Sequence, residues 1–169
     1  LLDVLADGQP LPNIGSTNGE PWEGTVCQFA QRRMRTIVVW LTHCSETRVA
    51  RLELDDAAVV EPIPRPAKTW LAIGDSITQG MTSTTPAAAY AALVAAELGC
   101  ELRNTGVGGE TMKPFLGSGC RSIRADVATV ALGVNDFNSN AGLEAYEAHT
   151  RGLLDGLLAS RPALPVGLI

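Results

Sequence analysis

The sequence has no long hydrophobic run and no stripe of basic residues. No uninterrupted apolar stretch approaches the ~18–20 residues that cross a bilayer, so we expect no membrane span. The net charge is −5 and the basic residues are scattered, which is unlike proteins that track a nucleic-acid backbone. We therefore expect no nucleic-acid partner.

Paired cysteines and cofactor motifs are missing as well. The four cysteines, at positions 27, 44, 100 and 120, form no Cys-x-x-Cys pair and no Cys/His cluster, so we expect no metal site. We expect free, buried thiols; the alternative is a Cys27–Cys44 disulfide, which requires an oxidising compartment. The glycines of residues 106–109 do not form Gly-x-Gly-x-x-Gly, and no Gly-x-Ser-x-Gly turn occurs. We expect no cofactor, and the common α/β-hydrolase fold is disfavoured.

The composition is that of a globular protein, with 46% hydrophobic and 18% charged residues in 169. Residues 1–60 are rich in turn signals and β-branched residues, and predict a β-rich module with strands at 36–41 and 51–54. Residues 61–67 carry proline at every second position, which favours an extended linker.

Residues 68–169 alternate between strand and helix patterns, which is typical of a parallel sheet with helical crossovers. Apolar runs predict strands at 69–73, 102–107 and 127–132, with a fourth from near Pro165. Helices are predicted from Thr85 to Gly99 and over 143–160. We expect apolar faces on the two helices formed by Tyr90, Leu93, Val94 and Leu98, and by Leu143, Tyr146, Leu153, Leu154, Leu157 and Leu158.

Residues 165–169 have the pattern of the middle of a strand, so we expect the chain to be part of a longer protein. Apolar surface on the 143–158 helix or on the fourth strand is then expected to lie exposed and to favour self-association.

Three polar, glycine-containing segments follow three of the predicted strands. They are Gly-Asp-Ser-Ile-Thr-Gln-Gly at 74–80, Gly-Gly-Glu-Thr at 108–111 and Gly-Val-Asn-Asp at 133–136. The carboxyl ends of parallel strands meet at one sheet edge, where such folds bind ligands. Ser76 could act there as a nucleophile, and the neutral amide of Asn135 could stabilise a developing oxyanion. We expect Asp75 and Asp136 to support their loops through hydrogen bonds.

These segments resemble the first, second and third motif blocks of the SGNH (GDSL-type) esterase and lipase superfamily. The resemblance implies a flavodoxin-like three-layer α/β/α fold in which Ser76 is the nucleophile. It also implies that the Ser76 and Gly109 N–H groups and the Asn135 side chain form the oxyanion hole. The order of a β module before the hydrolase part resembles bacterial carbohydrate esterases with an N-terminal jelly-roll-like domain.

The superfamily's Asp-x-x-His element is absent from residues 1–169. His43 lies in the β module and His149 inside a predicted helix, and both are interpreted as surface residues. The catalytic base is expected beyond Ile169. The resemblance implies a carboxylic ester hydrolase that acts on a small-molecule or carbohydrate ester with a short acyl group. The alternatives are an acyltransferase or thioesterase, and a non-catalytic binding protein that keeps the fold.

Overall fold

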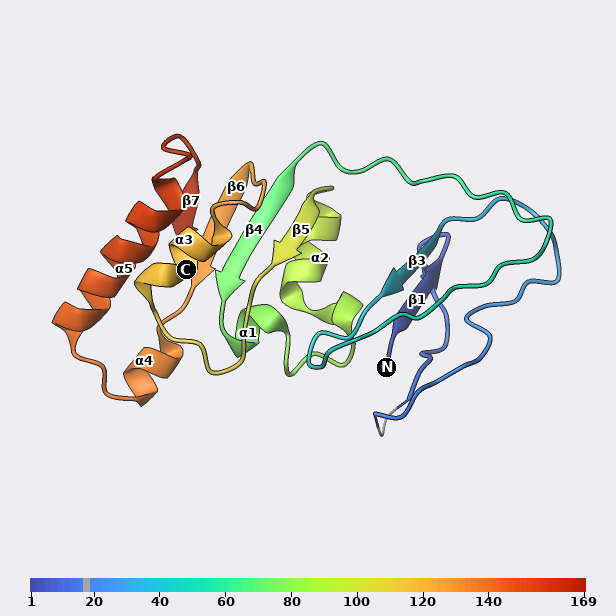
Figure 1. Ribbon diagram of the computed structural model, residues 1–169, viewed down its shortest axis with the longest axis horizontal. Coiled ribbons are helices and arrows are strands. Elements are labelled where there is room, and N and C mark those ends of the chain that lie inside the picture. The colour runs from blue at the N-terminus through green and yellow to red at the C-terminus, as the bar shows by residue number, and fades with distance from the viewer. Residues whose placement is uncertain (17–18) are drawn as a thin grey trace.

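The computed structural model describes residues 1–16 and 19–169, and the strands of this part of the chain form two sheets (Figure 1). The first is antiparallel, in the order β2-β1-β3, with β1 (Asp3–Ala6), β2 (Gln9–Pro10) and β3 (Ile37–Trp40). The second is parallel, in the order β5-β4-β6-β7, with β4 (Thr69–Gly74), β5 (Glu101–Asn104), β6 (Val127–Ala131) and β7 (Val166–Leu168). The four strands predicted from residue 68 onward are thus present, with small shifts in their bounds.

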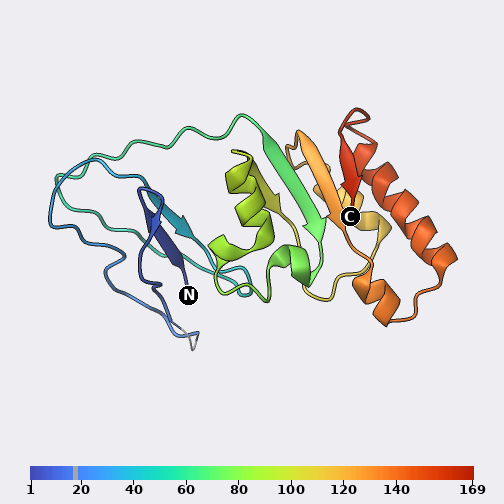
Figure 2. The ribbon, with the colours of Figure 1, turned by 180° about the vertical axis from the view of Figure 1, so that it is seen from behind.

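The parallel sheet is covered by helices on both faces, because the side chains of β4 alternate between two cores. Leu71 and Ile73 pack in one core with Leu153 and Leu157 of α5 (Leu143–Leu158). Trp70 and Ala72 point to the other face and pack against α2 (Tyr90–Glu97). Figure 2 shows the same arrangement from behind, with the antiparallel sheet beyond α2. The three-layer α/β/α fold expected for residues 68–169 is therefore observed.

Helix α2 buries a different face from the one predicted. Its alanines at positions 91, 92 and 95 are buried, whereas Leu93, Val94 and Leu98 are 56%, 40% and 71% exposed. The alanines let the helix lie close to the sheet beside the large Trp70 side chain, which takes the space that leucines would fill. A short 3-10 helix, η1 (Pro86–Ala88), precedes α2 where the sequence predicted one continuous helix.

Helix α3 (Pro114–Cys120) packs against α5, and the sequence did not predict it. Gly117 makes this contact close: a Cβ atom there would overlap the Leu153 carbonyl. On α5, Leu153 and Leu157 are buried as predicted, but Leu143 is 73% exposed at the first turn. Leu168 and Ile169, at the end of β7, are 56% and 76% exposed.

Residues 51–54 form no strand in the described chain, contrary to the prediction, and they are exposed. Their alternating pattern finds no neighbouring strand to pair with, and a strand depends on such pairing. The predicted strand at 36–41 is observed as β3. The proline-rich residues 61–67 are exposed and outside regular structure, and lead directly into β4.

All four cysteines are free, so the alternative of a Cys27–Cys44 bridge is wrong. Of the four, Cys120 is buried and Cys44 is exposed, which corrects the expectation that all would be buried. In the described part of the chain, none of the helices combines the length and hydropathy needed to span a membrane.

Candidate active site

Ser76 begins helix α1 (Ser76–Gln79) immediately beyond the carboxyl end of β4, an inner strand of the parallel sheet that pairs with β5 and β6. Asp75 is the N-cap of this helix, and its buried carboxylate accepts the Ile77 N–H at 2.8 Å. Ser76 is half-buried, and neither its N–H nor its hydroxyl hydrogen-bonds any residue that the structure describes. The local structure thus holds a serine at the sheet edge with both polar groups unused.

The loop that follows β5 lies directly against α1. Gly106 is in contact with the α1 backbone, because a Cβ atom there would overlap the Gln79 nitrogen. The Gly108 N–H donates to the Gln79 side-chain oxygen at 2.7 Å. Gly109 has φ +78°, a conformation that strongly favours glycine. Its N–H donates to no group within residues 1–16 and 19–169.

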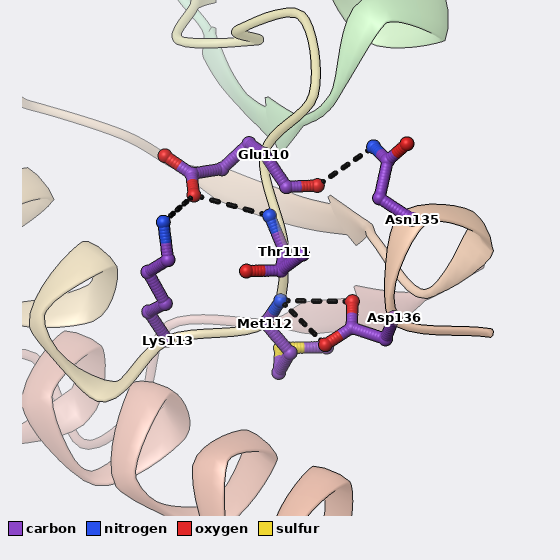
Figure 3. A network of polar contacts seen from close by, with 6 residues as sticks. All are labelled: Glu110, Thr111, Met112, Lys113, Asn135 and Asp136. Carbon is purple, nitrogen blue, oxygen red and sulfur yellow. Dashed lines mark hydrogen bonds and ion pairs between the residues drawn. The ribbon is translucent and has the colours of Figure 1, made fainter. Parts of the chain in front are cut away.

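The loop that follows β6 carries Asn135 and Asp136 on helix α4 (Val134–Asn138). The Asn135 side-chain amide donates one hydrogen bond to the Glu110 carbonyl at 2.9 Å, which leaves its second N–H available. The carboxylate of Asp136 is buried and accepts the Met112 N–H. Hydrogen bonds at Asn135 and at Asp136 therefore join the loops that follow β5 and β6, as Figure 3 shows.

Glu110 is fixed from its side chain as well as from its carbonyl (Figure 3). Its carboxylate accepts the Lys113 ammonium at 2.5 Å and the Thr111 N–H at 3.1 Å. The hydrogen bond from Lys113 holds the pKa of Glu110 below its ordinary value, and burial opposes this only in part. The ionised carboxylate thus supports the loop whose carbonyl receives Asn135.

The structure places the sequence-predicted residues as follows. Ser76 and Asp75 lie on the α1 turn, Gly109 on the loop after β5, and Asn135 and Asp136 on α4. The α1 turn contacts the loop after β5 through Gln79 and Gly108, and that loop contacts α4 through Glu110 and Asn135. Sequence reasoning missed Gln79 and Glu110, which make these contacts. Both lie inside the quoted motif segments, which is the signal that could have drawn attention to them.

Neither histidine contacts Ser76 by a hydrogen bond. His149 is exposed on α5. His43 is half-buried, and its Nε2 lies 3.2 Å from the Ser83 hydroxyl. No group of histidine, cysteine, aspartate and glutamate side chains suited to a metal ion occurs among the described residues.

A largely apolar hollow of about 370 Å³ opens beside the α1 turn. It is lined by Asp75, Ile77, Tyr90, Ala131, Leu132, Val134 and Ile169. Ile77 and Val134 border it from the first and third loops, and both are exposed. The hollow is therefore largely apolar where it borders the α1 turn that carries Ser76.

Residues 72–168 match the family model of the GDSL-like lipases and acylhydrolases. A search of curated protein sequences found no match. Among solved structures, the chain is similar to the salicylyl-acyltransferase SsfX3 from a tetracycline biosynthetic pathway. The TM-score is 0.75 at 20% identity, over 98% of this chain and 47% of that one, so the chain spans about half of the acyltransferase.

Two further structures share the fold. One is a family 2 carbohydrate esterase with a carbohydrate-binding domain from Corynascus thermopiles (Myceliophthora fergusii). It matches with TM-score 0.69 and 21% identity, over 99% of this chain and 64% of that one. The other is AlinE4, an SGNH-hydrolase family esterase, with TM-score 0.54 and 23% identity, over 60% of this chain and 57% of that one. These similarities confirm the SGNH hydrolase fold expected from the sequence.

Proposed function

The chain belongs to the GDSL-like lipase/acylhydrolase family, and we propose that it is a carboxylic ester hydrolase that forms an acyl-enzyme on Ser76. The observation that carries this proposal is the environment of Ser76. Its hydroxyl and N–H are unused by the described residues at the carboxyl end of the inner strand β4. Loops with further unused donors follow the two neighbouring strands, which is what an acyl-transfer site requires.

In the proposed reaction the Ser76 oxygen attacks the ester carbonyl carbon. The C–O bond to the alcohol then breaks, and the alcohol leaves with a proton. Water attacks the resulting acyl-serine, which releases the acid and restores the hydroxyl. The N–H groups of Ser76 and Gly109 and the free N–H of the Asn135 amide would bind the oxyanion of both tetrahedral intermediates.

The reaction also needs a base for the proton of the Ser76 hydroxyl. His43 is bonded to Ser83, and His149 is exposed on α5. Neither imidazole is in place to accept that proton. Ser76 is therefore an unactivated alcohol among the described residues, and a test of the proposal has to supply a base.

We propose that the substrate is an ester of a short acyl group with a small-molecule or carbohydrate alcohol. The order of an antiparallel sheet before the hydrolase part supports this preference, since the family 2 carbohydrate esterase matches nearly the full chain. Acyl transfer is the second candidate, because the acyltransferase matches with TM-score 0.75. Both candidates share the acyl-serine and differ in whether water or an alcohol receives the acyl group.

The decisive experiment follows acetylation of Ser76 by 4-nitrophenyl acetate, with imidazole in the buffer as the base. Peptide mapping by mass spectrometry identifies the acetylated residue, and the time course of acetyl-Ser76 gives the rate, because imidazole itself releases 4-nitrophenol from the ester. We expect acetyl on Ser76 in the unmodified chain and none at this position after Ser76→Ala. Asn135→Ala should slow the step by about 10²-fold, the lower end of the effect of losing an oxyanion donor.

Asn138→Ala is the matched control, because Asn138 is an exposed asparagine at the end of the same helix. It should leave the rate unchanged. If Ser76 of the unmodified chain gains acetyl no faster than Ser139, an exposed serine, the chain is a binding protein that keeps the fold without the chemistry. Adding a sugar alcohol then separates hydrolysis from transfer: an acetylated sugar as the main product indicates a transferase.

A further inference from the structure

The side chain of Gln79 joins two segments that are far apart in the sequence. Its Nε2 donates to the His43 carbonyl at 2.8 Å, and its Oε1 accepts the Gly108 N–H at 2.7 Å. Gln79 is the last residue of α1, three positions after Ser76, and is half-buried. A glutamine amide suits this place because it offers a donor and an acceptor on one short planar group.

The Gly108 end of this connection leads to the proposed oxyanion donor. Gly109 is the next residue, and a Cβ atom there would meet nothing within 4 Å. Gly109 is therefore open on the side where a side chain would stand. Both of its neighbours are held by hydrogen bonds: Gly108 N–H donates to Gln79, and Glu110 N–H donates to the Val107 carbonyl at 3.1 Å.

The His43 end leads to the N-terminal segment. Residues 42–45 are folded on themselves through the Thr42 hydroxyl, which lies 2.8 Å from the Ser45 carbonyl oxygen. The His43 imidazole reaches the Ser83 hydroxyl at 3.2 Å. The N-terminal segment is attached a second time, where the Asp3 carboxylate accepts the Ala87 N–H at 2.9 Å. The His43 carbonyl that Gln79 binds thus lies on a loop that is fixed by its own hydrogen bonds.

We propose that Gln79 is a positioning residue that couples the 42–45 loop to the Gly109 N–H. In this arrangement the N-terminal segment helps to set the oxyanion donor of the hydrolase part through one neutral side chain. Gln79 acts through Gly108 and needs no contact with the substrate. The inference deepens the proposed function and depends on it for its catalytic consequence.

Two substitutions distinguish the hydrogen bond of Gln79 to Gly108 from its hydrogen bond to His43. Gln79→Met keeps the length of the side chain and removes both hydrogen bonds. Gln79→Glu keeps an acceptor for Gly108 and loses the donor to His43. In ¹⁵N NMR, we expect Gln79→Met to speed the exchange of the Gly108 amide hydrogen with solvent about tenfold, as the loss of one hydrogen bond implies. Gln79→Glu should keep this amide hydrogen protected from exchange. Both variants should shift the resonances of residues 42–45.

The catalytic readout is the imidazole-assisted acetylation of Ser76. Gln79→Met should lower the maximal rate about tenfold with little change in the ester concentration at half-maximal rate, since a misplaced oxyanion donor affects the transition state. His43→Ala, which frees the 42–45 loop from Ser83, should shift the Gly109 amide resonance. It should do so much less in a chain that already carries Gln79→Met. Gln31→Met, at an exposed glutamine, is the control.

The inference would be overturned if the Gln79→Met chain acetylates Ser76 at the wild-type rate. It would also be overturned if His43→Ala shifts the Gly109 amide resonance equally in the unmodified and the Gln79→Met chains. If Ser76 of the unmodified chain is not acetylated at all, the proposed function fails instead. The coupling is then decided by NMR alone. It is supported if His43→Ala shifts the Gly109 amide resonance much less in the Gln79→Met chain than in the unmodified chain, and overturned if the two shifts are equal.

Discussion

The Asp136 carboxylate accepts the main-chain N–H of Met112, with its two oxygens 3.2 and 3.0 Å from the nitrogen. Both residues are nearly inaccessible, at 5% and 2% exposure. Asp136→Ala should therefore cost about 1–3 kcal/mol of unfolding free energy, because it leaves a buried N–H without an acceptor. Asp136→Asn keeps one oxygen and should cost less. Urea unfolding of the two variants checks the order, and equal midpoints would contradict it.

The contact between α3 and α5 predicts opposite effects for two glycines of α3. Gly117→Ala should destabilise the fold by about 1–3 kcal/mol, because the new methyl group overlaps the Leu153 carbonyl and forces the helices apart. Gly119→Ala meets nothing within 4 Å and should be neutral or stabilise by up to about 1 kcal/mol through helix propensity. Thermal unfolding of both variants measures this. A Gly117→Ala chain as stable as the wild type would show that the helices can separate at little cost.

The lowered pKa of Glu110 predicts a loss of stability in acid. The Lys113 hydrogen bond favours the ionised carboxylate in the folded chain, so the unfolded chain binds the proton more readily. The contribution is complete above the ordinary pKa of 4.5 and is lost as the pH falls through the lower folded value. Glu110→Gln should flatten the acid side of the stability curve between about pH 6 and pH 3. The exposed change Glu147→Gln is the control and should leave the curve's shape unaltered.

The cysteines should differ strongly in their reaction with a thiol reagent such as 5,5′-dithiobis(2-nitrobenzoate). Burial raises the pKa of the Cys120 thiol, whereas Cys44 is exposed. Because the thiolate is the reactive form, Cys44 should react first and Cys120 only on unfolding. Peptide mapping after brief labelling identifies the modified residue. Early modification of Cys120 would mean that the core beneath α3 opens readily.

The sequence predicted the elements whose signal is local. The apolar runs of β4 and β6 and the leucines of α5 at 153 and 157 lie where their patterns placed them. Helix α3 was not predictable in this way, because its glycines disfavour an isolated helix. Its stability comes from packing against α5, which is distant in the sequence. The buried face of α2 was mispredicted for a similar reason: Trp70, on another element, determines what fits beneath it.

In the candidate site, too, the residues in local motifs could be predicted, whereas the contacts between distant positions could not. Ser76, Gly109 and Asn135 could be named because each lies in a short motif directly after a strand. The hydrogen bonds of Gln79 could not be predicted, because their partners lie 36 and 29 positions away in the chain. Contacts over such distances depend on the path of loops, which no local pattern encodes.

The position of β4 between β5 and β6 has a consequence for how the protein folds. Parallel pairing with β5 on one side and β6 on the other requires two separate crossover connections to close. Helices α2 and α5 can form early, since their hydrogen bonds are local, while the parallel pairs are slow to form. The ability of Ser76 to take an acyl group should therefore return late in refolding, after most of the helical circular dichroism signal has recovered.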